Sequence, residues 1–556
     1  MSRPIGLDSE KGGGLALSVE ARPLGLTGAL ERRAALVLCV LALLGFGLRV
    51  GGLGAVGFAE DEVNKLEAVR AYGRGAWSEN SEHPMLMKGL IFVSMGVARW
   101  WSPEGGISDE AALRFPNALF GALTVVPLFL LTSALFNRRT GLLAAALWAF
   151  GINAITYNRI GKEDTLLVFF MLSAFYFYLR AKQTSGFKQQ AKGRAYTLSA
   201  VSFGLMLASK YFPHYFGLNM LYHHFARVRR REPGEPRGRT PRLFYVLVLL
   251  TFVAVNPAVL LPETWAYLSA YSSEQLLTHH GYLMGERLYE NTMSATPFGG
   301  TPVYFYLLFL VIKVPLPLLV AFACGLVYCA RRWREPGAAF LLLMLVLWIV
   351  PYSLAGAKWL RYTLTLMPFV YMTAAVGIVA LVRGAAGWLA ARGLSPMTHA
   401  PLVATLVAVL VFVVAPTYTV YKKMPLYALY TNALAPQTAG RFFPHDEFYD
   451  AGLREAIAHV ARVAPRGALI AHETPGVVRY YLDKFGRTDL QPRVISDARF
   501  DARLAPTGAF IIMQRGRTYF ENREELEHIR TSARFRKDYE VLLRGARAAE
   551  VYVASD

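Results

Sequence analysis

The chain has 556 residues, of which 54% are hydrophobic and 18% are charged. Because a soluble domain usually carries about a quarter charged residues, this composition argues against a water-soluble enzyme, a disordered chain or a collagen-like fibre. Three cysteines are too few for a disulfide-rich secreted scaffold. The length suffices for a polytopic membrane domain of roughly 400 residues and one small soluble domain.

The net charge is +20, from 59 Lys and Arg residues against 39 Asp and Glu residues. Nucleic-acid binding is one explanation for such a charge. However, the basic residues lie in short loops between apolar runs, with no stripe of basic and exposed aromatic residues. Basic loops on one side are how a membrane protein fixes its orientation, so we expect no nucleic-acid partner.

Apolar runs of about 20 residues, the length that crosses a bilayer, recur along the chain. The clearest is Leu243–Leu261, which has no charged residue. The stretch 196–225 is long enough for two short helices, which we expect to break near Pro213. The first run has no small-residue cleavage site, so we expect an uncleaved span. The remaining runs lie at 34–53, 113–135, 141–157, 165–180, 303–329, 338–355, 363–382 and 400–420. Together they predict about eleven transmembrane helices.

The apolar segment Met85–Trp101 contains Lys88 and Arg99, and it decides the orientation. If it crosses the membrane, the basic run Arg227–Arg231 lies outside. If it lies along the membrane surface, all the basic segments are cytoplasmic, as the positive-inside rule favours. We therefore predict an interfacial amphipathic helix here. The segments that become cytoplasmic are 32–33, 138–139, 182–194, 227–242, 331–332 and 383–392.

This orientation places four loops outside, at 54–112, 158–164, 262–302 and 356–361, together with the region from about 421. The C-terminal region shows helical periodicity at 452–463, 477–484 and 523–529, and short apolar strands at 468–471 and 509–512. We therefore predict a cytoplasmic tail (1–33), a transmembrane domain (34–420, with interfacial helices in its first outer loop, 54–112) and a small extracytoplasmic α/β domain (421–556).

Ionisable groups in the outer loops lie close to membrane depth, where they are costly and therefore candidates for function. Glu60, Asp61 and Glu62 follow the first span. Acids favour the first turn of a helix, so one interpretation is a helix start. The other is a carboxylate that acts as general base on a hydroxyl.

Two further segments allow two interpretations each, and a third is a weak metal candidate. His83 and Lys88 either cap an interfacial helix or line a site. The turn from Arg159 to Asp164 is either a satisfied ion-pair turn or an anion site beside a base. The adjacent pair His279-His280 falls short of the three or more ligands of a usual metal site, so we expect no metal.

Basic residues at the outer helix ends run against the positive-inside bias. They are Lys210, Lys358 and Arg361, followed by Tyr362. One such residue is explained by a side chain that extends to the interface, but three together are better explained by an anionic headgroup.

The chain has no glycine-rich phosphate loop after a strand and no Gly-x-Ser-x-Gly motif, so an energy-rich substrate is expected from outside a nucleotide pocket. A polyprenyl phosphate that carries a sugar fits outward-facing cations and a carboxylate. The cations would stabilise the leaving phosphate, and the carboxylate would deprotonate the acceptor hydroxyl. One base without a second nucleophile favours a single displacement with inversion. The main alternative is a transporter or flippase of such lipids, which would need polar groups near the midplane and repeat symmetry. A scaffold protein whose tail docks partners is a further alternative.

Five motifs in order resemble those of C-type-fold (GT-C) membrane glycosyltransferases. The resemblance is to the protein O-mannosyltransferase group (glycosyltransferase family 39) and to the related aminoarabinose transferase of lipid A. The motifs are Asp61-Glu62; His83-Pro84-Met85-Leu86-Met87-Lys88, which departs from the family pattern at both methionines; Arg159-Ile160 with Asp164; Pro302–Tyr306 followed by Lys313-Val314-Pro315-Leu316-Pro317; and Lys358–Tyr362 with Pro368.

The resemblance implies a polytopic α-helical GT-C fold and a role for each matched residue. Asp61 would be the catalytic base, with Glu62 supporting it or the acceptor. The donor phosphate would be held by Lys210, Lys358, Arg361 and Tyr362. The cavity would be lined by His83, Lys88, Arg159, Asp164 and His279.

The resemblance also implies catalysis without a metal or other cofactor. The 262–302 loop is too short for the luminal carbohydrate-recognition-like insertion of the eukaryotic mannosyltransferases, so the acceptor is left open as a protein, lipid or glycan. The character of the basic loops favours a bacterial inner membrane, in contact with membrane lipids.

Overall fold

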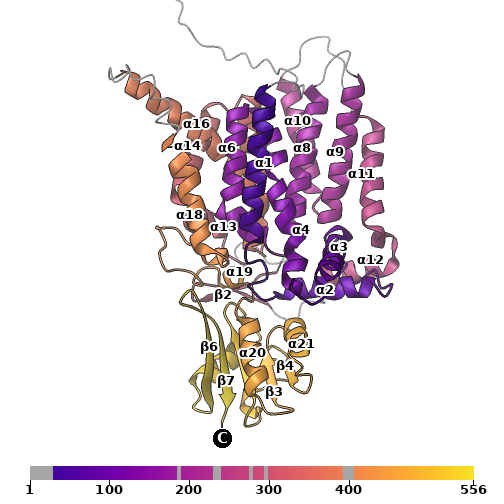
Figure 1. The fold of residues 1–556 in the computed structure, drawn as a ribbon, viewed down its shortest axis with the longest axis vertical. Coiled ribbons are helices and arrows are strands. Elements are labelled where there is room, and N and C mark those ends of the chain that lie inside the picture. The colour runs from indigo at the N-terminus through magenta and orange to yellow at the C-terminus, as the bar shows by residue number, and fades with distance from the viewer. Residues whose placement is uncertain are drawn as a thin grey trace, which may run out of the picture.

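The computed structural model describes residues 29–183, 189–229, 240–273, 280–292, 299–391, 406–407 and 409–555. Figure 1 shows a bundle of long helices with an α/β region attached to one end. The expectations for His279, for residues 1–28 of the tail, for much of the basic loop 227–242 and for part of the 400–420 run lie outside the described residues.

Apolar helices occupy the predicted runs. The bundle contains α1 (Ala29–Val50), α4 (Asp109–Leu123), α5 (Val125–Leu135), α6 (Arg138–Phe150), α8 (Asp164–Gln183), α9 (Gln189–Ser209), α10 (His214–Arg229), α11 (Arg242–Val255), α13 (Phe305–Lys313), α14 (Leu316–Arg331), α15 (Pro336–Leu354), α16 (Met367–Ala391) and α18 (Ala415–Lys423). Short elements link them: α7 (Ile152–Tyr157), η1 (Pro257–Leu260), the hairpin β1 (Tyr282–Met284) and β2 (Arg287–Tyr289), η2 (Leu360–Thr365), η3 (Leu410–Val414), η4 (Tyr427–Leu429) and α19 (Pro444–Phe448). The predicted break before Pro213 is confirmed, since α9 ends at Ser209 and α10 begins at His214.

Five helical stretches among the described residues are long and apolar enough to cross a membrane. They are Arg32–Val50, Asp109–Leu135, Asp164–Gln183, Pro336–Leu354 and Met367–Trp388. Two shorter apolar helices are Arg242–Val255 and Leu316–Arg331. The chain is therefore a largely helical membrane protein, and the number of about eleven spans stays a prediction.

The connections between helices that we expect in the cytoplasm lie together at one end of the bundle. The Tyr222 hydroxyl near the end of α10 donates to the Pro336 carbonyl at the start of α15 (3.1 Å). Gly337 lies so close to the corner between α5 and α6 that a Cβ there would be 2.6 Å from the Leu135 carbonyl oxygen. The basic segments that adjoin these helix ends are 138–139 and 331–332.

Three helices lie at the other end of the bundle, where the α/β region is attached: α2 (Glu60–Tyr72), α3 (Met85–Trp101) and α12 (Pro262–Ser272). Helix α3 forms over the range that the sequence predicts. It buries Met87, Ile91 and Met95 and exposes Val93 and Trp100 on another face. An exposed apolar face at the end of a bundle is typical of a helix that lies in the membrane interface.

The α/β region contains a five-stranded mixed sheet of β3 (Leu469–His472), β4 (Gln491–Val494), β5 (Phe510–Gln514), β6 (Phe535–Leu543) and β7 (Ala546–Ala554) in the order β4-β3-β5-β7-β6. Strand β3 is parallel to β4 and β5, and β7 is antiparallel to β5 and β6. Its helices are α20 (Leu453–Val463), α21 (Pro475–Lys484) and α22 (Arg523–Thr531), with a short η5 (Ala502–Leu504). The elements expected at 452–463, 468–471, 477–484, 509–512 and 523–529 are all observed.

The α/β region and the end of the bundle share one apolar core. Val63 and Leu66 of α2 and Leu113 of α4 belong to the same buried cluster as Ile457 of α20 and Val477 of α21. Burial of apolar surface is the main favourable term in folding, so this shared core fixes α2 between the two regions.

Candidate active site

Asp61 lies in the first turn of α2, and about 31% of its side-chain surface is exposed. Its Oδ1 is 2.9 Å from Lys162 Nζ, and its Oδ2 is 3.3 Å from Arg361 Nη1. The Tyr449 hydroxyl donates a hydrogen bond of 2.7 Å to Oδ2. Lys162 precedes α8, Arg361 lies in η2 and Tyr449 follows α19, so three distant segments converge on one carboxylate.

These cations keep Asp61 ionised. Burial alone would raise the pKa of Asp61, but Lys162, Arg361 and Lys65 outweigh it and hold the pKa well below its usual range. Burial lowers the pKa of Lys162 to about 8, although Asp61 opposes that shift. Burial would lower the pKa of Arg361, but Asp61, together with Tyr449, Tyr362 and Asp164, raises it well above its usual value.

A second carboxylate, that of Glu163, lies close to Lys162. Glu163 is buried, with Oε1 2.9 Å from Lys65 Nζ and Oε2 3.9 Å from His83 Nδ1. The other ring nitrogen of His83 is 3.4 Å from Lys162 Nζ. Burial lowers the pKa of His83 well below its usual value, which keeps the ring neutral at physiological pH.

Asp164 and Lys210 form the third buried pair, with 2.7 Å between Oδ1 and Nζ. The Lys210 ammonium lies 4.5 Å from the ring centres of both Phe212 and Tyr362. Arg361 also lies over the Tyr362 ring, at 5.6 Å. Tyr362 therefore stands between two of the cations that the sequence assigns to a donor phosphate.

We call these seven charged residues the ion cluster: Asp61, Lys65, Lys162, Glu163, Asp164, Lys210 and Arg361. It holds four cations and three carboxylates. A surplus of buried positive charge is unfavourable without an anion nearby, so the cluster is suited to bind one.

Glu62 faces a different environment from Asp61. Its side chain is fully buried and accepts two hydrogen bonds from Arg114, of 2.8 and 2.6 Å. It also accepts the backbone N–H groups of Ala59 (3.0 Å) and Gly161 (2.8 Å). Glu62 therefore fixes the start of α2 in this structure and presents no open face to an acceptor.

The Arg159 side chain binds backbone carbonyls at the end of α1. Its guanidinium donates to the carbonyls of Arg49 (2.6 Å), Gly51 (2.7 Å) and Gly52 (2.8 Å). Arg49 lies in the last turn of α1, where carbonyls lack a partner within the helix, and Gly51 and Gly52 directly follow the helix. Arg159 therefore caps the end of α1. The structure thus brings Asp164 into the ion cluster and gives Arg159 another set of contacts.

Lys358 and Lys88 are held by backbone carbonyls. The fully buried Lys358 ammonium donates to Thr301 (2.6 Å) and Ala355. The Lys88 ammonium donates to Asn80 (2.6 Å), His83 (2.8 Å) and Glu79 (3.3 Å). Burial lowers the pKa of Lys88 to about 7 and that of Lys358 to about 8. Each of the two side chains thus stabilises the loops that supply these carbonyls, beside the ion cluster.

The sequence analysis did not select Lys65, Lys162, Glu163 or Tyr449 as site residues. Lys162 and Glu163 had a signal, because they lie in the same turn as Asp164. Tyr449 had none, since it is 388 residues from Asp61 along the chain. Across the described ranges, no group of three or more His, Cys, Asp or Glu side chains has an arrangement suited to a metal ion.

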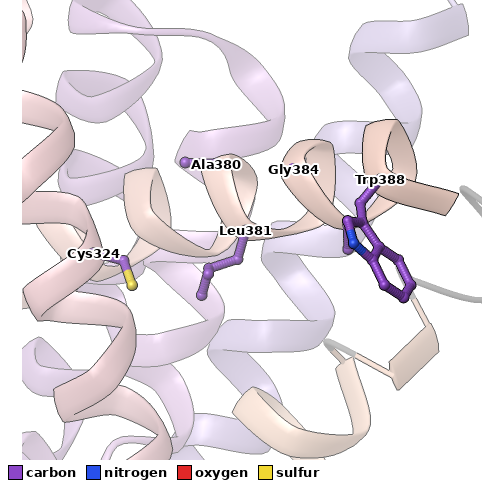
Figure 2. A pocket seen from close by; sticks show the side chains of 6 residues that line it. Cys324, Ala380, Leu381, Gly384 and Trp388 are labelled. Carbon is purple, nitrogen blue, oxygen red and sulfur yellow. The ribbon is translucent and has the colours of Figure 1, made fainter. Parts of the chain in front are cut away.

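Two apolar hollows have no Asp or Glu side chain in their linings. One, of about 480 Å³, is lined by α1, α3 and α4, with Phe46, Val93 and Phe115 among its walls and no ionisable side chain. The other, between α14 and α16, is lined by Cys324, Leu381 and Trp388 among others (Figure 2). Such linings suit a lipid chain and cannot carry out sugar chemistry.

Comparisons with known proteins bear on the fold of the chain. A family model described as dolichyl-phosphate-mannose-protein mannosyltransferase matches residues 106–260. The structure of ArnT from Cupriavidus metallidurans bound to undecaprenyl phosphate is similar at a TM-score of 0.51 and 13% identity, over 94% of this chain and 98% of that chain. The apo oligosaccharyltransferase of Archaeoglobus fulgidus is similar at a TM-score of 0.51 and 12% identity, over 86% of this chain and 69% of that chain. No curated protein matches the chain in sequence.

The chain therefore has the GT-C fold of membrane glycosyltransferases. The resemblance that the five motifs indicate is confirmed, both to the mannosyltransferase group and to the lipid A aminoarabinose transferase.

Proposed function

We propose that this protein is an integral membrane glycosyltransferase. It transfers a sugar from a polyprenyl phosphate to a hydroxyl of a protein, lipid or glycan. The observation that carries the proposal is the partly exposed Asp61 carboxylate, 2.9 and 3.3 Å from Lys162 and Arg361. A base next to cations with surplus charge is what transfer from a phosphate-linked donor requires.

The proposed reaction is a single displacement. Asp61 takes the proton of the acceptor hydroxyl, and the hydroxyl oxygen attacks the anomeric carbon. The bond between this carbon and the phosphate oxygen breaks, and the polyprenyl phosphate leaves with the bonding electron pair. Arg361, Lys162 and Lys210 stabilise the negative charge that develops on the leaving phosphate. The configuration at the anomeric carbon is inverted.

The low pKa of Asp61 has a consequence for the order of events. A carboxylate held by Lys162 and Arg361 is a weak base. A donor phosphate competes for the same two cations, and drawing them away raises the proton affinity of Asp61. Donor binding thus activates the base, which implies that the donor binds before the acceptor is deprotonated.

Other predicted site residues take supporting roles in this proposal. Tyr362 orients Arg361 and Lys210, and Asp164 positions Lys210. Lys358 stabilises the loop that carries Arg361, while Lys88 stabilises the loop that carries His83. The cavity between α1, α3 and α4 accepts a lipid chain.

The arrangement favours this function over a transporter. Asp164 begins α8, and Lys210 directly follows the end of α9, so the ion cluster lies at helix ends. A transporter would place such groups near the bilayer midplane. By the positive-inside rule, the end that carries segments 138–139 and 331–332 faces the cytoplasm. The ion cluster and the α/β region then face the outside of a bacterial inner membrane.

The test uses the purified full-length protein with a panel of polyprenyl-phosphate sugars and membrane extract as acceptor. Release of polyprenyl phosphate is measured by mass spectrometry. Asp61→Asn should reduce release by at least about a hundredfold. Asp497→Asn, which changes an exposed carboxylate paired with Arg499, is the matched control and should retain activity. Full activity of Asp61→Asn would refute the proposal.

A further inference from the structure

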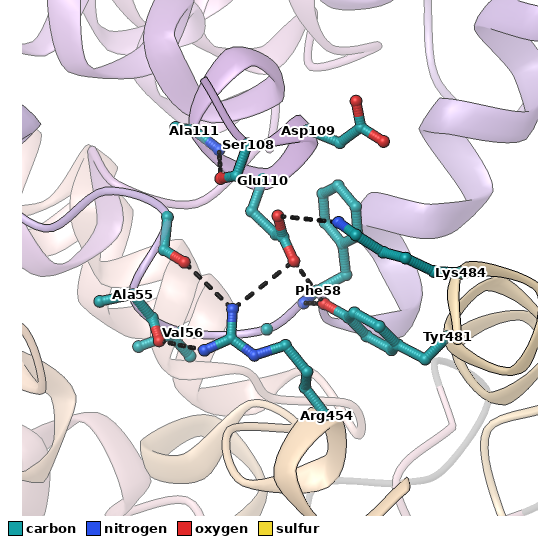
Figure 3. Close-up of polar contacts among 12 residues, drawn as sticks. Ala55, Val56, Phe58, Ser108, Asp109, Glu110, Ala111, Arg454, Tyr481 and Lys484 are labelled. Atoms are coloured by element: carbon teal, nitrogen blue, oxygen red, sulfur yellow. Dashed lines mark hydrogen bonds and ion pairs between the residues drawn. The ribbon is translucent and has the colours of Figure 1, made fainter. Parts of the chain in front are cut away.

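The loop between α1 and α2, residues 51–59, leads directly to Asp61 and is held by the α/β region. Arg454 of α20 donates to the carbonyls of Gly54 (3.1 Å) and Ala55, and its Nη1 is 3.6 Å from Glu110 Oε1 (Figure 3). The start of this loop is thereby joined to α20.

Tyr481 of α21 holds the loop further along. Its hydroxyl accepts the N–H of Phe58 (2.8 Å) and donates to the buried Glu110 carboxylate (2.8 Å). Lys484 approaches the other oxygen of Glu110 at 3.9 Å. Figure 3 shows these side chains meeting the loop from the α/β side.

Asp450 holds the first residue of α2. Its carboxylate accepts the backbone N–H of Glu60 (2.9 Å) and pairs with Arg517 at 2.7 and 2.5 Å. Arg517 also donates to the Glu60 carboxylate (2.7 Å). The N-terminal end of α2 is therefore fixed by two residues of the C-terminal part of the chain.

Tyr449, which donates to Asp61, adopts the left-handed backbone conformation with φ of +45°, and Asp450 follows with φ of +63°. Positive φ is unusual for a bulky residue such as tyrosine and persists where the surroundings impose it. This turn aims the Tyr449 hydroxyl at Asp61 while Asp450 faces α2.

We propose that the turn Tyr449-Asp450, which leads into α20 of the α/β region, is part of the catalytic site, and that Tyr449 is the positioning residue for the Asp61 carboxylate. This inference rests on the proposed function. Tyr449 and Arg361 share Oδ2, whereas Lys162 faces Oδ1. When a donor phosphate draws the two cations away, the neutral phenol stays on Oδ2. The carboxylate then keeps its rotamer, with Oδ1 free to take the acceptor proton.

The inference is tested with Tyr449→Phe, which removes only the hydroxyl. The matched control is Tyr480→Phe, which removes the hydroxyl that donates to Asp109 (2.7 Å). Rates are referred to the folded fraction, measured by gel filtration. We expect kcat of Tyr449→Phe to fall about tenfold or more at an unchanged KM for the donor, because the lost bond is one to a charged acceptor. Tyr480→Phe should keep both constants.

An unchanged kcat in Tyr449→Phe would overturn the inference, and so would a raised KM at constant kcat, which would assign the hydroxyl to donor binding. These results would leave the proposed function intact as long as Asp61→Asn is inactive. Activity of Asp61→Asn would instead refute the proposed function.

Discussion

The two ends of the helix bundle differ in how far their charged side chains are exposed. At the end away from the α/β region, Arg332 and Glu335 form an ion pair with 46% and 52% of their side-chain surfaces exposed. At the other end, Lys65 and Glu163 form a pair with 1% of each side chain exposed. Exposed charges of this kind serve orientation and solvation, whereas buried ones need a structural or chemical reason. The difference supports the proposal that the active site lies at the end with the ion cluster.

The buried charges themselves fall into two groups. Arg114 and Arg159 donate to backbone carbonyls around the end of α1, and Arg114 also binds Glu62. Lys162 and Arg361 meet Asp61, which is partly open. The first group should matter for stability and the second for turnover.

The largest effect on stability is expected for Glu62→Ala. It leaves the Arg114 guanidinium buried without its carboxylate, which costs about 3–5 kcal/mol. Glu335→Ala at the exposed pair should cost less than about 1 kcal/mol. Unfolding of the purified protein with denaturant measures both, and equal losses at the two ends would remove the contrast between them.

The largest effect on turnover after Asp61→Asn is expected for Arg361→Met. Loss of one charge-stabilising donor should lower kcat about a hundredfold, because it acts on the leaving phosphate. Arg332→Met at the opposite end should leave kcat unchanged. A loss of activity in both variants would mean that overall charge, and not the ion cluster, governs the rate.

A smaller effect is expected for the pH profile. Burial lowers the pKa of Lys162 to about 8, so a rate that needs its positive charge should decline as pH rises through about 8. Lys162→Arg keeps its charge at higher pH, and the alkaline limb should move upward. The substitution leaves unchanged the groups that face position 162, which are Asp61, Lys65, His83, Glu163 and Arg361. If the alkaline limb stays at the same pH in Lys162→Arg, the decline in rate comes from a group other than Lys162.

Much of the helical frame could be predicted from the sequence, because apolar runs of membrane length have few other uses. A helix at Met85–Trp101 was predicted and is observed, while its place in the membrane interface stays a prediction. The break before Pro213 followed from proline chemistry. Strands β6 and β7 were missed, since charged residues such as Arg536 and Lys537 hide their alternation. Strand β4 was missed because it is short, exposed and contains a proline.

The candidate site could be predicted only where a sequence motif marks its residues. Asp61 and Arg361 were found from motifs and do meet. Arg159 and Asp164 belong to one motif, yet only Asp164 joins the ion cluster, because a sequence does not show which way each side chain of a turn points. The contact of Tyr449 with Asp61 depends on how α2 packs against the turn before α20, which no local pattern encodes.

The most direct measurement is a structure of the protein with bound polyprenyl phosphate. The account predicts phosphate oxygens within about 3 Å of Arg361 and Lys162, with Asp61 released from at least one of them and still bonded to Tyr449. A phosphate bound at the opposite end of the bundle, or one that leaves every contact of Asp61 intact, would contradict it.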